Sequence, residues 1–303
     1  MGYALALTAL LTGVSSFVLL KTYLIPTVEG QVVTSSNVAS GLTRIDGATD
    51  ASNDTGKVVS TDTSYSDDNI QIMVSTVRYA DTDVHIADVR LSSAAYLQTA
   101  LAQNAFGTNV TQKTSEIAAE HGAILAINGD YYGANRRGYV IKNGVIYRDT
   151  ARKTTEYDDL VIYRDGSFGI VNESEVTAQE LLDSGVVNLF AFGPTLVKNG
   201  QVTVSENEEV GRAMAENPRT AIGVVDELHY IFVVADGRTN SDDGLSLRQL
   251  AQVMQQYGCQ TAYNLDGGGS STMVFNEQVI NDPTTNGGRI SERSVSDIVY
   301  IGY

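Results

Sequence analysis

The stretch Tyr263-Asn-Leu-Asp-Gly-Gly-Gly-Ser-Ser271 interrupts a pattern of apolar runs near the end of the chain. It contains three consecutive glycines, namely Gly267, Gly268 and Gly269. Glycine adopts positive φ without strain, so such a run can curve its backbone amides into a nest for an anion or a hydroxyl. Asp266 would place a carboxylate at the mouth of this nest, with Asn264 and Ser270 beside it. A flexible hairpin loop is the alternative, but these polar neighbours favour a site.

The residues on both sides of this stretch predict regular structure. Apolar residues repeat at helical spacing over 247–257, Ser246 and Gln249 form a capping box, and Gly258 supplies a stop signal. Residues 272–276 are typical of a strand. We therefore expect the glycines to form a loop between two strands, behind a packed helix.

Composition excludes several classes of protein. The chain has 303 residues, of which 43% are hydrophobic, so it can bury a large core. Its formal net charge is −16, which opposes binding to nucleic acid because no basic face could neutralise phosphates. The lone Cys259 excludes an intramolecular disulfide and a cysteine-rich metal cluster.

No metal or cofactor is required by the sequence. His85, His121 and His229 lie far apart and lack the spacing of a zinc site. Carboxylates and carbonyls suit Ca²⁺ or Mg²⁺ better, but no EF-hand spacing is present. We expect activity without added metal, and a divalent cation bound by Asp130 or Asp266 is the alternative.

The first 68 residues predict an anchor and a spacer. Residues 4–20 are apolar and uncharged, and with the extension to Ile25 they reach the roughly 20 residues of a transmembrane helix. Residues 1–25 therefore predict an uncleaved membrane anchor, and a signal peptide is the alternative. Residues 26–68 are rich in Ser, Thr and Asp and predict a flexible linker. The chain is then a single-pass protein of the cell membrane, with region 69–303 extracellular.

Region 69–303 predicts an α+β domain with a twisted mixed, mainly antiparallel sheet and a few packed helices. Apolar runs at 70–79 and 83–91 predict paired strands, and residues 94–105 and 115–121 predict helices. Hairpin turns are indicated by Asn-Gly and Asp-Gly pairs at 143–144, 165–166 and 199–200.

Polar residues gather where predicted strands begin or end. They are Asn128 and Asp130, Arg219 and Thr220, Asp236 and Arg238, and Asn264 and Asp266. Strand ends present side chains to a common cleft, so these residues predict a site for acid/base chemistry on an anionic or sugar substrate.

Each pair also has a structural interpretation. Asp236-Gly237 is typical of an ordinary turn, and Arg219 could serve only in a salt bridge. Asp130 could bind its own backbone as a turn carboxylate. The co-occurrence of four such clusters in one domain favours the site.

Five motifs appear in an order that resembles the phosphodiester glycosidase family. They are Asn128-Gly-Asp-Tyr-Tyr132, Asn217-Pro-Arg-Thr-Ala-Ile-Gly223, Ala235-Asp-Gly-Arg238, Asn264-Leu-Asp-Gly-Gly-Gly-Ser270 and Arg293-Ser-Val-Ser-Asp297. The resemblance covers roughly residues 70–303. Mammalian members carry a small residue where Asp130 stands, which makes the catalytic role of Asp130 the least supported.

The resemblance implies an exported hydrolase of glycosyl-1-phosphodiester bonds in a cell-surface polysaccharide, such as an exopolysaccharide, or in a wall polymer. Asp266 or Asp236 would face the sugar as nucleophile or base. Arg219 and the amides of Gly267, Gly268 and Gly269 would stabilise the leaving phosphate, with Asn128, Thr220, Arg238, Asn264 and Ser270 as substrate-binding residues. Two alternatives remain: a non-hydrolytic glycan-binding module, and a glycosidase for bonds without phosphate.

The N-terminal pattern generates a prediction about membrane attachment. Because residues 1–25 lack a cleavage signal, the full chain should sediment with membranes, and cutting within 26–68 should release the domain. Fractionation followed by immunoblotting checks this. Recovery of an intact form beginning after Ile25 from the medium would establish a cleaved signal peptide instead.

Overall fold

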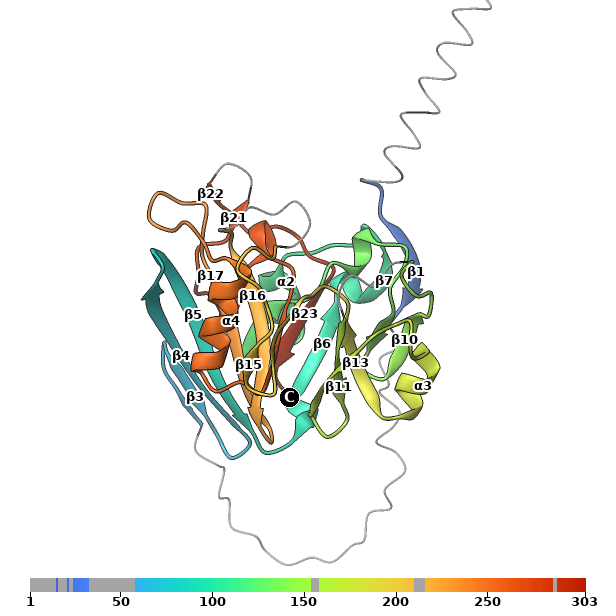
Figure 1. The fold of residues 1–303 in the computed structure, drawn as a ribbon, viewed down its shortest axis with the longest axis horizontal. Coiled ribbons are helices and arrows are strands. Elements are labelled where there is room, and N and C mark those ends of the chain that lie inside the picture. The colour runs from blue at the N-terminus through green and yellow to red at the C-terminus, as the bar shows by residue number, and fades with distance from the viewer. Residues whose placement is uncertain are drawn as a thin grey trace, which may run out of the picture.

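The computed structural model describes residues 15, 21, 24–32, 58–153, 158–209, 216–285 and 288–303. Two antiparallel sheets, of nine and five strands, form the body of this part of the chain (Figure 1). The nine-stranded sheet has the order β15-β14-β18-β16-β17-β5-β4-β3-β2, and the five-stranded sheet has the order β20-β19-β8-β23-β6.

The strands of the nine-stranded sheet are β2 (Val59–Ser60), β3 (Ser64–Ser66), β4 (Ile70–Tyr79), β5 (Thr82–Leu91), β14 (Thr195–Lys198), β15 (Gln201–Val202), β16 (Arg219–Asp226), β17 (His229–Ala235) and β18 (Thr261–Asn264). Those of the five-stranded sheet are β6 (Leu97–Leu101), β8 (Leu125–Asn128), β19 (Met273–Phe275), β20 (Gln278–Val279) and β23 (Asp297–Ile301).

Smaller elements surround these sheets. A three-stranded sheet holds β11 (Asp159–Tyr163), β12 (Phe168–Val171) and β13 (Val186–Phe190). The two-stranded ribbons are β1 (Thr27–Gln31) with β7 (Ala105–Thr108), β9 (Val140–Lys142) with β10 (Val145–Arg148), and β21 (Thr284–Thr285) with β22 (Arg289–Ile290). The helices are α2 (Thr114–Glu120), α3 (Ala178–Asp183) and α4 (Leu247–Gln256). Short 3₁₀ turns are η2 (Ala94–Tyr96), η3 (Ala102–Asn104), η4 (Tyr132–Ala134) and η5 (Gly268–Ser270).

Strand β17 shows how the core is layered. Its side chains alternate between two faces, as the period of two in a strand requires. Phe232 packs toward the five-stranded sheet, where Ile127 and Phe275 lie in the same buried cluster. Val233, on the opposite face, packs in a second cluster with Leu250 of α4. Because both faces are covered, β17 is apolar along nearly its whole length.

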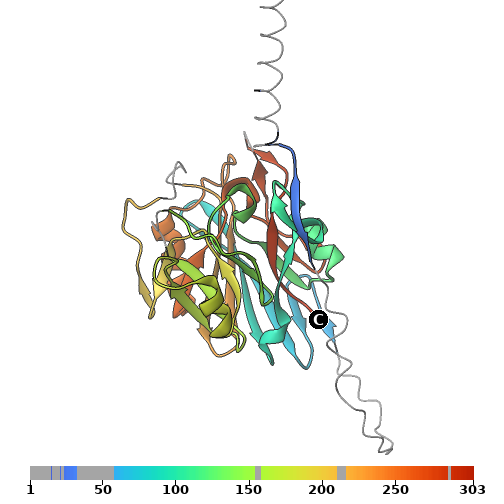
Figure 2. The same cartoon turned by 90° about the vertical axis from the view of Figure 1, so that its right-hand side faces the viewer.

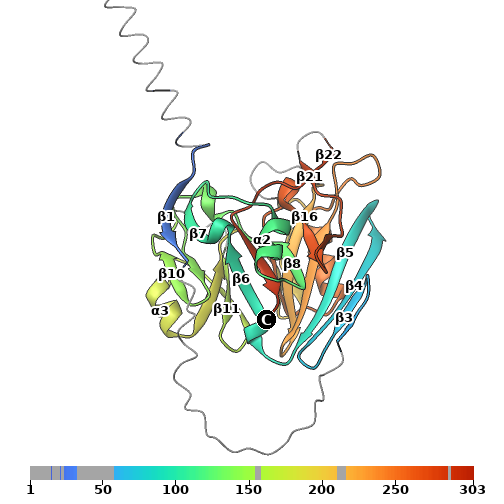
Figure 3. The same ribbon diagram turned by 180° about the vertical axis from the view of Figure 1, so that it is seen from behind.

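Each sheet is covered by a helix on its outer face. Helix α4 begins after Ser246, whose hydroxyl accepts a hydrogen bond from the backbone N–H of Gln249, so the predicted capping box is confirmed. Helix α2 packs through Ile117 against the outer face of the five-stranded sheet, including Ile298 (Figure 3). The layers therefore run from α4 through the two sheets to α2.

Two predictions about region 69–303 need correction. Every strand pairing in the described ranges is antiparallel, so the expected parallel component of the sheet is not found there. Residues 94–105, expected to be a helix, instead form β6 between two 3₁₀ turns. Leu97 and Leu101 point inward from β6, and burial outweighs the helix propensity of the alanines around them.

The predicted linker 26–68 is also partly ordered. Strand β1 pairs with β7 along the edge of the molecule (Figure 2), and β2 and β3 extend the nine-stranded sheet beside β4. The linker prediction is therefore wrong for these strands, and residues 33–57 lie outside the described part. The predicted anchor lies almost wholly outside it as well. Among the residues that the structure describes, none of the helices has the length and the hydropathy of a membrane span.

The layered core generates a stability prediction. Phe232→Ala should lower the free energy of unfolding by about 3–5 kcal/mol, because it leaves a cavity between the sheets. Met73 on β4 is 66% exposed, so Met73→Ala should change it by less than about 0.5 kcal/mol. Urea denaturation of both variants compares the two values. Equal losses would show that the two-sheet packing does not carry the stability.

Candidate active site

Asn128, at the end of β8, joins three segments that are distant in sequence. Its Oδ1 accepts hydrogen bonds from the Thr220 hydroxyl at 2.8 Å and the Thr272 N–H at 3.2 Å. Its Nδ2 donates to the backbone carbonyl of Asp266 at 2.7 Å. Asn128 and Thr220 are both fully buried at 0% exposure, so they position the site rather than contact a substrate from solvent.

The carboxylate of Asp266 is held by two side chains. Its Oδ2 accepts hydrogen bonds from the Ser270 hydroxyl at 2.6 Å and from Nη2 of Arg293 at 2.9 Å. Arg293 Nε also donates to the Ser270 hydroxyl at 2.9 Å, which closes a triangle. The Asp266 side chain is 11% exposed and that of Arg293 is 42% exposed, so the cluster meets solvent on the arginine side. Burial raises the pKa of Asp266, and the positive charge of Arg293 opposes this rise.

The glycines of the loop allow other parts of the chain to approach its backbone closely, and this matters more than the binding of a ligand by their amides. Gly268 has a φ of +61°, and a Cβ there would lie 2.9 Å from Nη2 of Arg238. A Cβ on Gly267 would lie 2.8 Å from the carbonyl oxygen of Pro218. The amide of Gly268 donates to that same Pro218 carbonyl at 2.8 Å, so the predicted nest of bare amides is wrong at this position.

Two guanidinium groups flank the glycine loop. Arg238 donates through Nε to Oδ1 of Asn217 at 2.9 Å and lies against Gly268. Burial and the nearby charge of Arg293 lower the pKa of Arg238. Arg238 and Arg293 therefore present positive charge on the side where Asp266 meets solvent, an arrangement suited to a phosphate.

Arg219 does not join this pair. Residues 219 and 220 are neighbours on β16, so their side chains point to opposite faces of the sheet. Thr220 points toward Asn128, and Arg219 points the other way, donating to the Leu245 carbonyl at 2.9 Å and pairing with Glu209. Arg219 is 2% exposed. The structure thus places the predicted phosphate-binding arginine in a buried ion pair.

Asp236 is buried and saturated with hydrogen bonds. Its Oδ2 lies 3.0 Å from Nε2 of His85, and its Oδ1 accepts from the Asn281 side chain and the Asp282 N–H, each at 3.0 Å. Asn281 also donates to the Ser271 carbonyl at 3.1 Å, which links Asp236 to the glycine loop. Asp236 therefore supports the loop and does not face solvent beside Asp266.

Asp130 has the structural role that was the alternative to catalysis: its carboxylate binds backbone amides. It accepts from the Tyr132 N–H and from the Ala191 N–H, each at 3.0 Å. Lys142 Nζ lies 3.9 Å from Asp130 and forms an ion pair with Asp297 at 2.7 Å. Asp297 is fully buried, and burial raises its pKa to about 7 despite the charge of Lys142.

Asn264 is the remaining predicted site residue. Its Nδ2 donates to the Gly193 carbonyl at 2.7 Å, and its Oδ1 is buried without a hydrogen-bond partner among the described residues. Within the same part of the chain, no group of three or more His, Cys, Asp or Glu residues converges to hold a metal ion.

Sequence reasoning missed Arg293 and the Lys142–Asp297 pair as members of the site region. Arg293 follows a loop, so no strand end marks it, and only its place in the motif Arg293-Ser-Val-Ser-Asp297 could have indicated it. Lys142 carries no local signal, because nothing around it suggests that a lysine would be buried.

The fold and the site define a two-sheet antiparallel domain with a carboxylate and paired arginines at a glycine loop. A sequence model of the phosphodiester glycosidase family matches residues 121–302. This range contains β8, the glycine loop and Arg293. The chain belongs to the phosphodiester glycosidase family.

Two curated relatives illustrate the similarity. The chain is 30% identical over 201 residues to the SPbeta prophage-derived uncharacterized protein YomE of Bacillus subtilis, covering 65% of this chain and 31% of that protein. It is 30% identical over 184 residues to N-acetylglucosamine-1-phosphodiester alpha-N-acetylglucosaminidase of Mus musculus, covering 56% of this chain and 35% of that enzyme. The chain thus spans about a third of the length of these relatives.

Solved structures show the same fold. The zebrafish N-acetylglucosamine-1-phosphodiester alpha-N-acetylglucosaminidase catalytic domain, auto-inhibited by its pro-peptide, matches with a TM-score of 0.60 at 21% identity, covering 77% of this chain and 83% of that chain. A hypothetical protein from Synechocystis matches with a TM-score of 0.59 at 14% identity, covering 78% of this chain and 62% of that chain. At these identities the likeness concerns the fold alone.

The buried Asp297 generates a pH prediction. Its raised pKa means that the folded state keeps a proton which the unfolded state releases at about pH 4. The contribution of Asp297 to the free energy of unfolding should therefore fall as the pH rises from about 4 to about 7. Asp297→Asn stays neutral, so this component should be absent from its stability curve.

Denaturation of both proteins across this pH range measures the effect. Asp62 is exposed and lies between β2 and β3, far from Asp297 in sequence. Asp62→Asn is therefore the control, and its free energy of unfolding should depend on pH as that of the wild type does. Parallel pH curves for wild type and Asp297→Asn would show that Asp297 is ionised throughout.

Proposed function

We propose that this chain hydrolyses glycosyl-1-phosphodiester bonds in an anionic glycan of the cell surface. The observation that carries the proposal is the cluster of Asp266, Ser270 and Arg293, with Arg238 against the adjacent glycine. A carboxylate beside two guanidinium groups matches a reaction in which a sugar carbon becomes positive while a phosphate departs. Membership in the phosphodiester glycosidase family supports the same reaction class.

In the proposed reaction, the carboxylate of Asp266 faces the anomeric carbon as nucleophile or base. The bond from this carbon to the phosphate oxygen breaks, and its electron pair leaves with the phosphomonoester. A water oxygen completes the new bond to the anomeric carbon and loses its proton to base. A phosphate is already a good leaving group, so a second carboxylate acting as acid is less necessary than for an ordinary glycoside.

Each supporting side chain has a defined task in this scheme. Ser270 and Arg293 hold Oδ2 of Asp266, which orients the carboxylate. The exposed side of Arg293 and the fork of Arg238 bind the phosphate oxygens and stabilise the charge that develops there. The predicted export through residues 1–25 would bring the domain to extracellular substrates.

The test is release of phosphomonoester from a synthetic sugar-1-phosphate diester. Asp266→Asn should lower turnover by about a thousandfold or more, because it removes the charge and the basic oxygen while keeping the size. Its melting temperature should stay near that of wild type. If activity persists and only stability drops, Asp266 merely caps the loop.

A companion pair of variants assigns the phosphate contacts. Arg238→Lys keeps the charge but loses the bidentate fork, so it should impair phosphodiesters more than a neutral aryl glycoside. Arg219→Lys is the matched control: it alters a buried ion pair and should affect stability first. An equal loss on both substrates with Arg238→Lys would support the alternative of an ordinary glycosidase. Binding without turnover by the wild type would support the glycan-binding module.

A further inference from the structure

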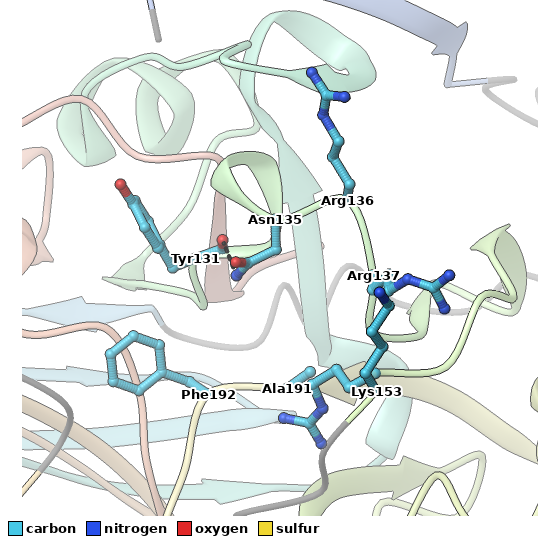
Figure 4. A pocket seen from close by; sticks show the side chains of 8 residues that line it. Tyr131, Asn135, Arg136, Arg137, Lys153, Ala191 and Phe192 are labelled. Carbon is cyan, nitrogen blue, oxygen red and sulfur yellow. Dashed lines mark hydrogen bonds between the residues drawn. The ribbon is translucent and has the colours of Figure 1, made fainter. Parts of the chain in front are cut away.

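A second cationic region lies beside the candidate active site. A cavity of about 530 Å³ has Arg136, Arg137 and Lys153 on one side and Tyr131 and Phe192 on the other (Figure 4), and Arg152 also lines it. The whole chain has 36 acidic and only 20 basic residues, yet this cavity has four basic side chains and no acidic one in its lining. Its local charge is therefore opposite to that of the protein.

Three of the four charges are available to a ligand. Arg152 is neutralised by ion pairs with Asp159 and Glu173. Arg136, Arg137 and Lys153 form no ion pair with any carboxylate in the described ranges. An uncompensated group of three cations attracts an anion, and guanidinium forks in particular match phosphate oxygens.

The opposite wall suits a sugar ring. Tyr131 is 49% exposed, and among the described aromatic side chains only Tyr303 is also exposed to this degree. Phe192 lies on the same side of the cavity (Figure 4). Aromatic faces pack against the apolar faces of sugars, so the cavity combines contacts for a sugar with contacts for an anion.

This cavity is tied to the candidate active site by hydrogen bonds. Tyr131 directly follows Asp130, whose carboxylate accepts from the N–H of Ala191 in the cavity wall at 3.0 Å. Asn264, two residues before Asp266, donates to the Gly193 carbonyl next to Phe192 at 2.7 Å. The cavity wall is therefore hydrogen-bonded to the strand that leads directly into Asp266.

We propose that this cavity is a second anion subsite, which binds the phosphodiester group of the repeat unit next to the one being cleaved. The inference rests on the proposed function and deepens it, because it names the substrate class. That class is a glycan with phosphodiesters in successive units, which the protein binds in preference to a single glycosyl phosphate.

The experiment measures how the full chain binds and cleaves two synthetic probes. One is the methyl phosphodiester of a single N-acetylhexosamine, and the other is a trimer of such units joined by 1-phosphodiester bonds. The variant Arg136→Gln/Lys153→Gln removes two charges whose side chains make no hydrogen bond or ion pair within the described residues. Arg90→Gln/Arg164→Gln removes the same charge from exposed sites elsewhere and serves as the control.

The wild type should bind the trimer at least about tenfold more tightly than the single unit at low salt, because additional charge-assisted contacts form. The Arg136→Gln/Lys153→Gln variant should lose this advantage, keep its affinity for the single unit, and raise KM for the trimer with little change in kcat. The control variant should behave as wild type.

Equal affinity of the wild type for both probes would overturn the subsite, as would an unchanged advantage for the trimer in Arg136→Gln/Lys153→Gln. Calorimetry measures binding and phosphomonoester release measures hydrolysis, so the subsite and the proposed activity can be refuted independently. Selective binding of the trimer without hydrolysis would refute the proposed activity and keep the subsite. Hydrolysis of both probes with equal KM would keep the activity and refute the subsite.

Discussion

The site depends on one buried amide. Asn128 is removed from water, so each of its polar atoms needs a partner, and an unmet one would cost about 1–3 kcal/mol. It meets this requirement by bonding to Thr220 on one sheet, to the carbonyl of Asp266, and to the N–H of Thr272 just before β19. The glycine loop has no side chains with which to pack. Its position relative to the two sheets therefore follows from hydrogen bonds, and Asn128 supplies the central ones.

Burial separates aspartates that look equivalent in the sequence. Asp130 and Asp236 accept from backbone amides and neighbouring side chains until their oxygens are occupied, which is the condition for keeping a polar group inside a protein. Asp266 instead meets Arg293, whose side chain is partly in solvent. Only Asp266 combines a held carboxylate with an approach from outside. Lys142 lies close to two buried carboxyl groups, with its Nζ 3.9 Å from Asp130 and 2.7 Å from Asp297.

Local chemistry predicted much of the fold and less of the site. The Asn-Gly pairs at 143–144 and 199–200 adopt positive φ in hairpins, as a type I′ turn requires at both of its central residues. The capping box of α4 and the glycine loop were predicted for similar local reasons. The order of strands within the sheets was not, because it depends on contacts between distant residues. The prediction that Arg219 binds phosphate was wrong for a related reason. The face to which a side chain at a strand end points depends on the register of the strand, and a shift by one residue exchanges Arg219 with Thr220.

The charge distribution decides how an anionic glycan can bind such an acidic chain. The net charge of −16 repels a polyanion, but at physiological ionic strength this repulsion is screened beyond about 8 Å. Within that distance, a glycan bound as proposed would contact Arg238 and Arg293 at the glycine loop, and then Arg136, Arg137 and Lys153 in the adjacent cavity. In this proposal, recognition is therefore a short-range property of two cationic sites on an acidic protein. Added salt screens the repulsion between the glycan and the acidic protein, but it also weakens the ion pairs at the two cationic sites. The affinity should therefore depend on ionic strength less steeply than it would for a uniformly basic protein.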